Sequence, residues 1–135
     1  MPSTYSAINI IYEDPSFVVI NKPPLIDSQN SKEGRNSVVE WLQDRYGFSG
    51  LVHRIDMGTS GLMVCAKIET MAAKLTKLLQ DGKIGRTYQA IVIGTKLPDS
   101  GEFREPLDEK EACSRYRVLK RFPNACFVEV ELETG

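Results

Sequence analysis

The chain has 135 residues, of which 41% are hydrophobic and 26% charged, and its formal net charge is −1. This composition is ordinary for a globular domain and excludes the strongly basic class of nucleic-acid-binding proteins. No apolar run approaches the roughly 20 residues of a membrane-spanning helix, and the N-terminus lacks the pattern of a signal peptide. We therefore predict a cytoplasmic protein without a membrane partner.

The first predicted element is a β-hairpin. Apolar runs at 10–12 and 17–20 flank the turn-forming residues 13–16. The prolines that follow cannot donate to a central ladder, so a loop is expected over 23–35.

A helix is predicted next, over 37–46. Asn36 is its expected N-cap and Gly47 its C-cap, and the apolar spacing between them places Trp41 in the core. The short apolar run at 62–66 then suits a buried strand.

A second helix is predicted over 69–81 and ends at Gly82. Lys74 and Lys77 lie off its apolar stripe, which consists of Met71, Ala72, Leu75, Leu78 and Leu79. The surrounding segment 67–96 holds six Lys/Arg against two Asp/Glu, a local basic island in an otherwise acidic chain. Such an island is either a solvated helix face or a contact surface for an acidic partner.

Three further segments have the composition of strands: 86–93, 112–119 and 126–132, with a turn at 122–125. The last strand alternates apolar and acidic residues, so one of its faces is expected to meet solvent. Strands outnumber helices and hairpins outnumber crossovers. This predicts an α+β fold with a mainly antiparallel mixed sheet and a few flanking helices. Because no repeat or Gly/Ser linker divides the chain, we predict a single domain over 1–135.

The cysteines are three in number and lack CxxC spacing. One would be left over in any disulfide scheme, so we predict buried, reduced thiols. One histidine and three scattered cysteines do not give paired ligand spacing, and no metal site is predicted.

A polar segment at 53–62 lies between two apolar runs and is the main candidate for a site. It combines an imidazole, a guanidinium, a carboxylate and two hydroxyls: His53, Arg54, Asp56, Thr59 and Ser60. Gly58 and Gly61 allow tight bends beside the carboxylate. Two interpretations stay open: a capped turn whose polar groups satisfy one another, or a site in which hydroxyls hold Asp56 ionised.

The string HRIDMGTSGLMVCAK at 53–67 resembles the signature of the RluA-type pseudouridine synthases, in which HRLD is followed by TSGL and an apolar strand ending in Ala-Lys. YED at 12–14 with VVINKP at 18–23 resembles the family's opening hairpin, and GRTYQA at 85–90 its second motif. The segments from 101 and from 112 resemble the next hairpin region, and LETG at 132–135 the lead-in to the third motif.

This resemblance implies an enzyme that isomerises uridine to pseudouridine in structured ribosomal or transfer RNA, with no cofactor. Asp56 would be the catalytic carboxylate beside C1′, and Tyr88 would stack on the base and offer its hydroxyl for proton transfer. Arg54 would contact RNA and hold the nucleotide out of its stack. His53, Thr59 and Ser60 would support the loop. The implied phosphate contacts are Lys67, Lys74, Lys77, Lys83 and Arg86.

The chain departs from the family pattern at Ile55, where leucine is commoner, at Gly58, where a side chain is common, and at its end. The family continues from Thr-Gly into an Arg-Thr-His-Gln-Ile-Arg type block that supplies a basic partner for the aspartate. We therefore expect a chain that lacks its C-terminal portion, with weak or no activity alone. The end directly after a strong strand is expected to reflect either this truncation or a strand edge that pairs with another molecule, such as a second copy of the chain.

Two alternatives belong to other classes. The first is a non-catalytic RNA-binding or scaffold remnant of the same fold. The second is a hydrolase using Ser60, His53 and Asp56, although three residues in one loop rarely reach triad geometry and no GxSxG elbow is present.

Overall fold

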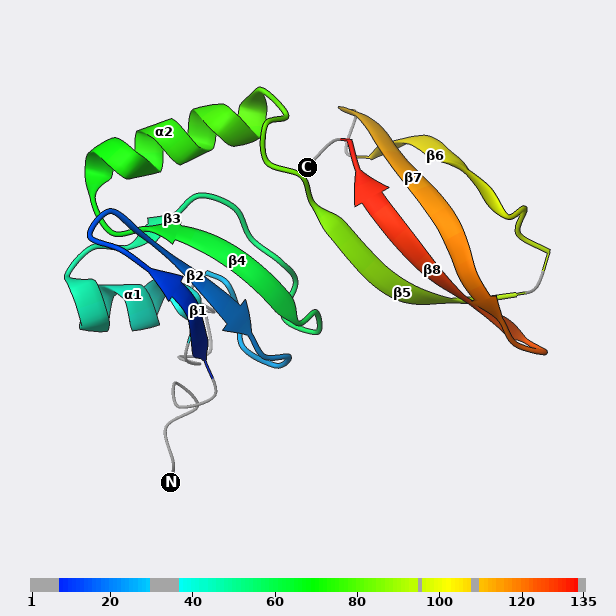
Figure 1. Cartoon of the computed structure of the whole chain (residues 1–135), viewed down its shortest axis with the longest axis horizontal. Helices are drawn as coiled ribbons and strands as arrows, with labels where there is room; N and C mark the ends of the chain where they lie inside the picture. Colours follow the sequence, from blue (N-terminus) through cyan, green and yellow to red (C-terminus); the bar gives the residue numbers. More distant parts are fainter. Residues whose placement is uncertain (1–7, 30–36, 95, 108–109, 134–135) are drawn as a thin grey trace. The chain divides into compact units, whose positions relative to one another are not determined.

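The computed structural model describes residues 8–29, 37–94, 96–107 and 110–133. The chain divides into two compact units, Met1–Asp81 and Gly82–Gly135 (Figure 1). Each unit has its own four-stranded sheet, and every strand pair in both sheets is antiparallel. The predicted α+β class is confirmed, with two sheets in place of one. That the two units fold as a single domain stays a prediction.

The sheet of the first unit has the strand order β1-β2-β4-β3. Its first two strands, β1 (Asn9–Glu13) and β2 (Phe17–Lys22), form the predicted hairpin. The carboxylate of Asp14 closes the turn by accepting hydrogen bonds from the amides of Ser16 (2.7 Å) and Phe17 (2.9 Å). The remaining strands are β3 (Gly50–Leu51) and β4 (Gly61–Ala66).

Helix α1 (Val38–Tyr46) follows the loop after the hairpin. Its N-cap is Ser37, whose hydroxyl accepts from the amide of Glu40 at 3.1 Å. The predicted cap, Asn36, lies outside the described residues. Gly47 ends the helix in the left-handed region with φ +71°, as predicted.

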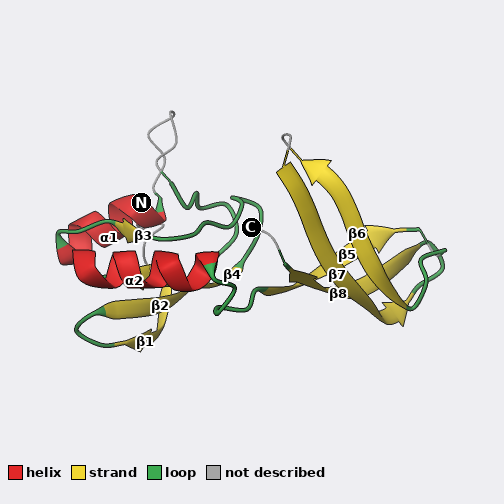
Figure 2. Cartoon of the chain, turned by 90° about the horizontal axis from the view of Figure 1, so that it is seen from above, coloured by secondary structure: helices red, strands yellow, loops and turns green. Residues whose placement is uncertain are grey.

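Helix α2 (Glu69–Gln80) is one residue shorter than predicted, with Asp81 rather than Gly82 at its C-cap. Both helices lie on one face of the first sheet (Figure 2). That face carries alternate residues of β2 and β4, since the strand period of two directs them to the same side. The buried side chains of this core include Val18, Ile20, Val38, Trp41, Leu42, Met63, Cys65 and Leu75.

The sheet of the second unit has the order β5-β8-β7-β6. Its strands are β5 (Thr87–Ile93), β6 (Ser100–Leu107), β7 (Lys110–Arg121) and β8 (Ala125–Leu132). The edge position of β6 accommodates Pro106, which has no amide donor.

The predicted acidic face of β8 is confirmed and is paired with arginines of β7. Arg117 contacts Glu129 at 3.0 Å, and Arg115 contacts Glu131 at 3.5 Å and Glu133 at 3.0 Å. These ion pairs lie at the surface, so they contribute little to stability individually but keep this face polar.

The three cysteines are free and buried, as predicted. Burial raises the pKa of the Cys65 thiol to about 12, which keeps this group protonated and unreactive at neutral pH. Among the described residues, no helix is both long and apolar enough to cross a membrane.

Candidate active site

Asp56 lies in the loop between β3 and β4 of the first unit, with its side chain exposed. The amide of Thr59 donates to the carbonyl of Asp56 at 2.9 Å and so closes a turn directly after the carboxylate. Gly61, with φ +141°, lets the chain enter β4 in a conformation that other residues rarely adopt. Gly58 has no positive φ, so the predicted glycine requirement holds at Gly61 alone.

A pocket of about 370 Å³ lies beside Asp56. One wall is formed by residues 27–29 and the other by residues 54–57. Across it, the Arg54 guanidinium donates to the Gln29 side-chain oxygen at 3.0 Å. The pocket therefore presents a carboxylate and a guanidinium together, in an open and mostly polar setting.

Hydrogen bonds from residues 25 and 28 hold the segment 54–57 that forms the second wall. Leu25 donates its amide to the carbonyl of Met57 at 2.7 Å. The buried hydroxyl of Ser28 donates to the Ile55 carbonyl at 2.6 Å and accepts from the Ile55 amide at 3.1 Å. The sequence predicted only a loop over 23–35, so these contacts of its first residues were missed.

Lys22 is the functional candidate that sequence reasoning overlooked. Its side chain is fully buried at the end of β2, and its ammonium donates to the carbonyls of Pro23 (2.9 Å), Ile26 (2.7 Å) and Met57 (3.3 Å). Burial lowers the pKa of Lys22, and the charges of Asp27 and Asp56 oppose that shift. The signal was present, because strand alternation puts residue 22 on the same face as the buried residues 18 and 20.

The predicted loop-supporting residues act through different groups. His53 accepts from the amide of Val64 on β4 at 3.1 Å through Nε2. Thr59 supports the loop through its main-chain amide, which donates to the Asp56 carbonyl. In the described part of the chain, neither the Thr59 nor the Ser60 hydroxyl makes a hydrogen bond to Asp56.

The predicted RNA-contacting residues fall in several places. Lys74 and Lys77 are exposed on α2, and Lys77 lies 3.9 Å from Asp81. Lys67 is occupied within its own unit: its ammonium bonds Glu13 at 3.2 Å and the Asp14 carbonyl at 2.9 Å, and it packs over Tyr46. None of the three lines the pocket beside Asp56.

Tyr88, Lys83 and Arg86 belong to the second unit. Tyr88 is half-buried on β5, opposite Val130 of β8. The carbonyl of Arg86 accepts from the amide of Leu132 at 3.1 Å, and the Arg86 Nε is buried with no hydrogen-bond partner among the described residues. The catalytic pairing of Tyr88 with Asp56 stays a prediction.

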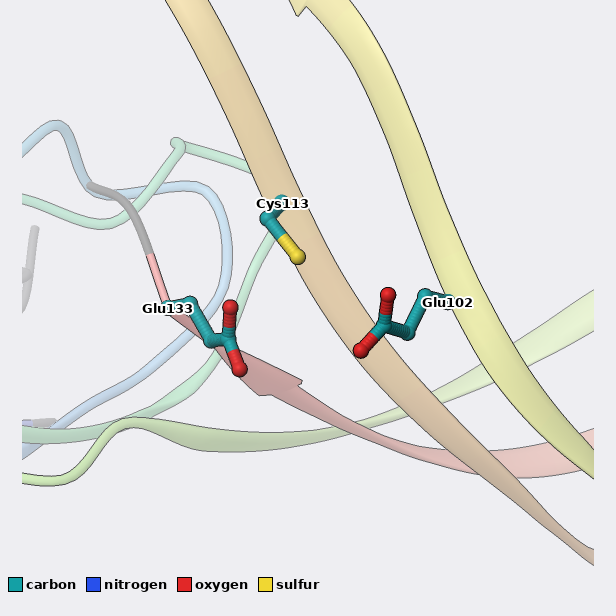
Figure 3. A group of neighbouring side chains, drawn as sticks. All are labelled: Glu102, Cys113 and Glu133. Carbon is teal, nitrogen blue, oxygen red and sulfur yellow. The ribbon is translucent and has the colours of Figure 1, made fainter.

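One group of potential metal ligands occurs in the second unit. The side-chain ligand atoms of Glu102, Cys113 and Glu133 lie within 4.8 Å of one another (Figure 3). Glu102 is paired with Arg104 at 2.7 Å and Glu133 with Arg115 at 3.0 Å. Both carboxylates thus have cationic partners within the sheet, and their charges are balanced without a metal ion.

Known proteins resemble this chain over most of its length. Residues 16–135 match the family model described as RNA pseudouridylate synthase. Ribosomal large subunit pseudouridine synthase D of Pasteurella multocida is 35% identical over 148 residues, which cover 95% of this chain and 46% of that protein. Dual-specificity RNA pseudouridine synthase RluA of the same organism is 32% identical over 140 residues, covering 91% of this chain and 64% of that protein. The chain thus spans about half the length of the first of these relatives.

Solved structures agree on the fold. Human RNA Pseudouridylate Synthase Domain Containing 4 superposes with a TM-score of 0.76 at 23% identity, over 97% of this chain and 62% of that one. Human RNA Pseudouridylate Synthase Domain Containing 1 gives a TM-score of 0.78 at 16% identity, over 100% and 63%. With the family match over residues 16–135, these findings show that the chain belongs to the RNA pseudouridylate synthase family.

Proposed function

We propose that this chain carries the catalytic aspartate, Asp56, of an enzyme that isomerises uridine to pseudouridine in structured ribosomal or transfer RNA. The observation that supports this most strongly is the pocket in which Asp56 and Arg54 lie together, within a segment that the family match covers. One relative named above is a synthase of the ribosomal large subunit and the other is a dual-specificity RNA synthase, which favours ribosomal RNA among the substrates.

The reaction rearranges bonds within one nucleotide. The bond between C1′ and N1 breaks, the freed base turns, and C1′ joins C5, while C5 loses a proton and N1 gains one. No oxidant or cofactor is needed for this balance. A carboxylate beside C1′ can attack the sugar or stabilise its developing positive charge, and either role needs Asp56 ionised.

The other predicted residues have binding roles in this proposal. Arg54 holds the extruded nucleotide, and its hydrogen bond to Gln29 fixes the direction of the guanidinium beside the pocket. Tyr88 stacks on the base. Exposed Lys74 and Lys77 attract the phosphate backbone. Lys67 is the weakest of the proposed RNA contacts, because its ammonium already has two partners.

Two further expectations belong to this proposal. We place the protein in the cytoplasm, because the relatives named above are bacterial enzymes that act on RNA. The expectation of a free edge on the last strand is wrong, because β8 lies between β5 and β7 and is paired on both sides. We propose instead that the edge strands of this sheet, β5 and β6, pair with a further protein segment or a second copy of the chain. Size-exclusion chromatography over a range of concentrations tests the second copy, and a monomer at every concentration excludes it.

The hydrolase alternative is disfavoured by the hydrogen bond from the Val64 amide to His53 Nε2, because that nitrogen cannot then accept a proton from Ser60.

An activity measurement distinguishes the scaffold alternative from the isomerase. Unmodified ribosomal and transfer RNA are incubated with the chain, with Asp56→Ala, and with Asp44→Ala on the exposed face of α1 as the matched control. Mass spectrometry then measures pseudouridine.

We expect at most weak pseudouridine formation by the chain alone, equal for the parent and for Asp44→Ala, and none with Asp56→Ala. If all three proteins bind RNA and none forms pseudouridine, the scaffold alternative replaces the isomerase for this chain.

A further inference from the structure

The wall of the pocket that lies opposite Asp56 carries two side chains that can contact a ligand. Asp27 and Gln29 belong to this wall, whereas Asp56 belongs to the other. The residue between them, Ser28, is 4% exposed, and its hydroxyl already bonds the main chain of Ile55. Asp27 is half-buried and Gln29 is exposed. The polar groups that this wall offers to a bound nucleotide are therefore a carboxylate and a side-chain amide.

The hydrogen bond from Arg54 fixes how the Gln29 amide is turned. The Arg54 guanidinium has only donors, so the Gln29 atom that it meets at 3.0 Å is the oxygen. This removes the usual ambiguity between the oxygen and the nitrogen of a side-chain amide. The Gln29 nitrogen lies at the other end of the amide, and within the described residues no hydrogen bond engages it. Gln29 therefore presents a donor to the pocket.

Asp27 has the opposite hydrogen-bonding ability and a fixed backbone. Its carbonyl accepts from the amide of Val38 at 2.9 Å, and it forms an isolated parallel bridge with Ser37, the N-cap of α1. These contacts anchor residue 27 to the start of helix α1. An ionised carboxylate only accepts hydrogen bonds. The wall thus combines an acceptor at residue 27 with a donor at residue 29.

Uracil matches this combination and cytosine does not. The edge of uracil that points away from the sugar has an N3–H donor beside the O4 acceptor, whereas cytosine has an N3 acceptor beside an N4 amino donor. We propose that Asp27 accepts from N3–H and Gln29 donates to O4 of the target base, so that these two residues select uracil over cytosine. This inference rests on the proposed isomerase function.

The same contacts suit the base after it has turned. When the freed uracil turns about the axis through N3 and C6, C5 takes the place of N1, and O2 takes the place of O4. N3–H stays on the axis. Asp27 and Gln29 therefore meet the same kinds of groups before and after the turn, so the loss of either contact weakens the binding of uridine and of pseudouridine alike.

The test compares the affinities of the full chain for three neutral nucleosides, uridine, pseudouridine and cytidine, by NMR titration. Neutral ligands ensure that a charge introduced on the protein does not act on a phosphate. Asp27→Ala removes the acceptor. Gln29→Glu keeps an oxygen for Arg54 but replaces the donor by a second acceptor. Gln43→Glu is the matched control, because the Gln43 oxygen also accepts a hydrogen bond, from the Ser49 hydroxyl at 3.0 Å, outside the pocket.

We expect the parent to bind uridine and pseudouridine equally and cytidine about 10-fold more weakly, because cytosine leaves the polar groups of the wall without hydrogen bonds. The side-chain amide signal that is absent from Gln29→Glu should shift when uridine is added to the parent. In Gln29→Glu, uridine should no longer bind more tightly than cytidine, since a carboxylate accepts from the cytosine amino group. Asp27→Ala should lower the preference for uridine, and Gln43→Glu should keep the parental ratio.

Equal affinities of the parent for uridine and cytidine would overturn the inference, and so would a parent that binds neither nucleoside. It is also overturned if the preference for uridine persists in Gln29→Glu, since Gln29 would then serve only to hold Arg54, or if the preference is lost equally in Gln43→Glu. A parent that forms no pseudouridine in RNA counts against the proposed function instead. The titrations still judge Asp27 and Gln29 in that case, because they need no turnover.

Discussion

Leu25 donates its main-chain amide to the carbonyl of Met57 at 2.7 Å while its own backbone has φ +71°. It is the one described residue other than glycine with a positive φ. Its side chain is 77% exposed, so packing does not hold it there. The hydrogen bond from the Leu25 amide to the Met57 carbonyl is therefore the interaction that can offset the cost of this backbone conformation.

Leu25→Gly is expected to stabilise the protein. Relief of the left-handed backbone gives about 1–2 kcal/mol, and the greater freedom of glycine in the unfolded chain offsets about 0.5–1 kcal/mol of it. Urea unfolding should show a small net gain. Leu25→Ala is the control, because it keeps the strain and should show none. A Leu25→Gly protein less stable than Leu25→Ala would contradict this account.

Gly50→Ala is expected to destabilise the first unit by about 3 kcal/mol or more, because a new side chain has no room. A Cβ on Gly50 would overlap the main-chain carbonyl of Ala66 and lie 2.8 Å from the Ala66 Cβ. The β3–β4 pair would have to separate.

Gly58→Ala is the matched control for Gly50→Ala. A Cβ there meets nothing within 4 Å, and the residue has no positive φ. Its unfolding free energy should stay within about 0.5 kcal/mol of the parent. Thermal melts of both variants measure the difference in stability. If both variants lose the same stability, the close approach of β3 to β4 is not the reason that residue 50 must be glycine.

Lys74→Ala and Lys77→Ala are expected to weaken RNA binding uniformly across RNA sequences. If each lysine neutralises one phosphate, the slope of log affinity against log salt concentration should decrease by about 0.7–0.9 per lysine. Filter binding at several salt concentrations measures this. Lys120→Ala, an exposed lysine on β7 outside the predicted contact set, is the control. If the slopes do not change, Lys74 and Lys77 lie on a solvated face of α2 and do not contact RNA phosphates.

Cys65 is expected to make stability depend on alkaline pH. Burial raises the pKa of its thiol from 9.0 to about 12 in the folded protein. Above pH 9 the unfolded thiol loses its proton while the folded one keeps it, so the unfolded state binds fewer protons. The stabilising contribution is complete below pH 9 and is lost as the pH rises toward 12, by up to about 4 kcal/mol.

Denaturant unfolding of the parent and of Cys65→Ala at pH 7 to 11 measures this contribution, since the thiol is absent from the variant. The two stability curves should be parallel below pH 8 and converge above pH 9. Curves that remain parallel up to pH 11 would show that Cys65 becomes accessible to water without unfolding.

The elements predicted from sequence are those fixed by local interactions. The β1–β2 hairpin follows from its turn residues, and α1 and α2 follow from apolar spacing with caps placed within one residue. Strand β3 was missed because it has two residues, and its pairing depends on Gly50 fitting against Ala66, which is a tertiary contact. The separation into two sheets was missed for a similar reason, since local patterns do not say which strands pair.

The candidate site divides in the same way. Asp56 and Arg54 were found because they stand in one contiguous motif. Ser28 and Gln29 were not, because their importance comes from hydrogen bonds to residues 25 to 27 positions later in the chain. Lys22 was not singled out, because the predicted strand stopped at residue 20 and a lysine on the core face conflicts with the usual exclusion of charge from the interior.

The burial of Trp41 in the first unit supplies a selective spectroscopic probe. It is the single tryptophan of the chain, it is 6% exposed, and its ring contacts Tyr46 edge-on. Its fluorescence therefore reports the melting of Met1–Asp81, whereas far-ultraviolet dichroism reports the strands of both units. Coincident transitions would mean that the two sheets unfold cooperatively, as a single domain requires, and separate transitions would mean that the half of the molecule bearing Asp56 is an autonomous folding unit.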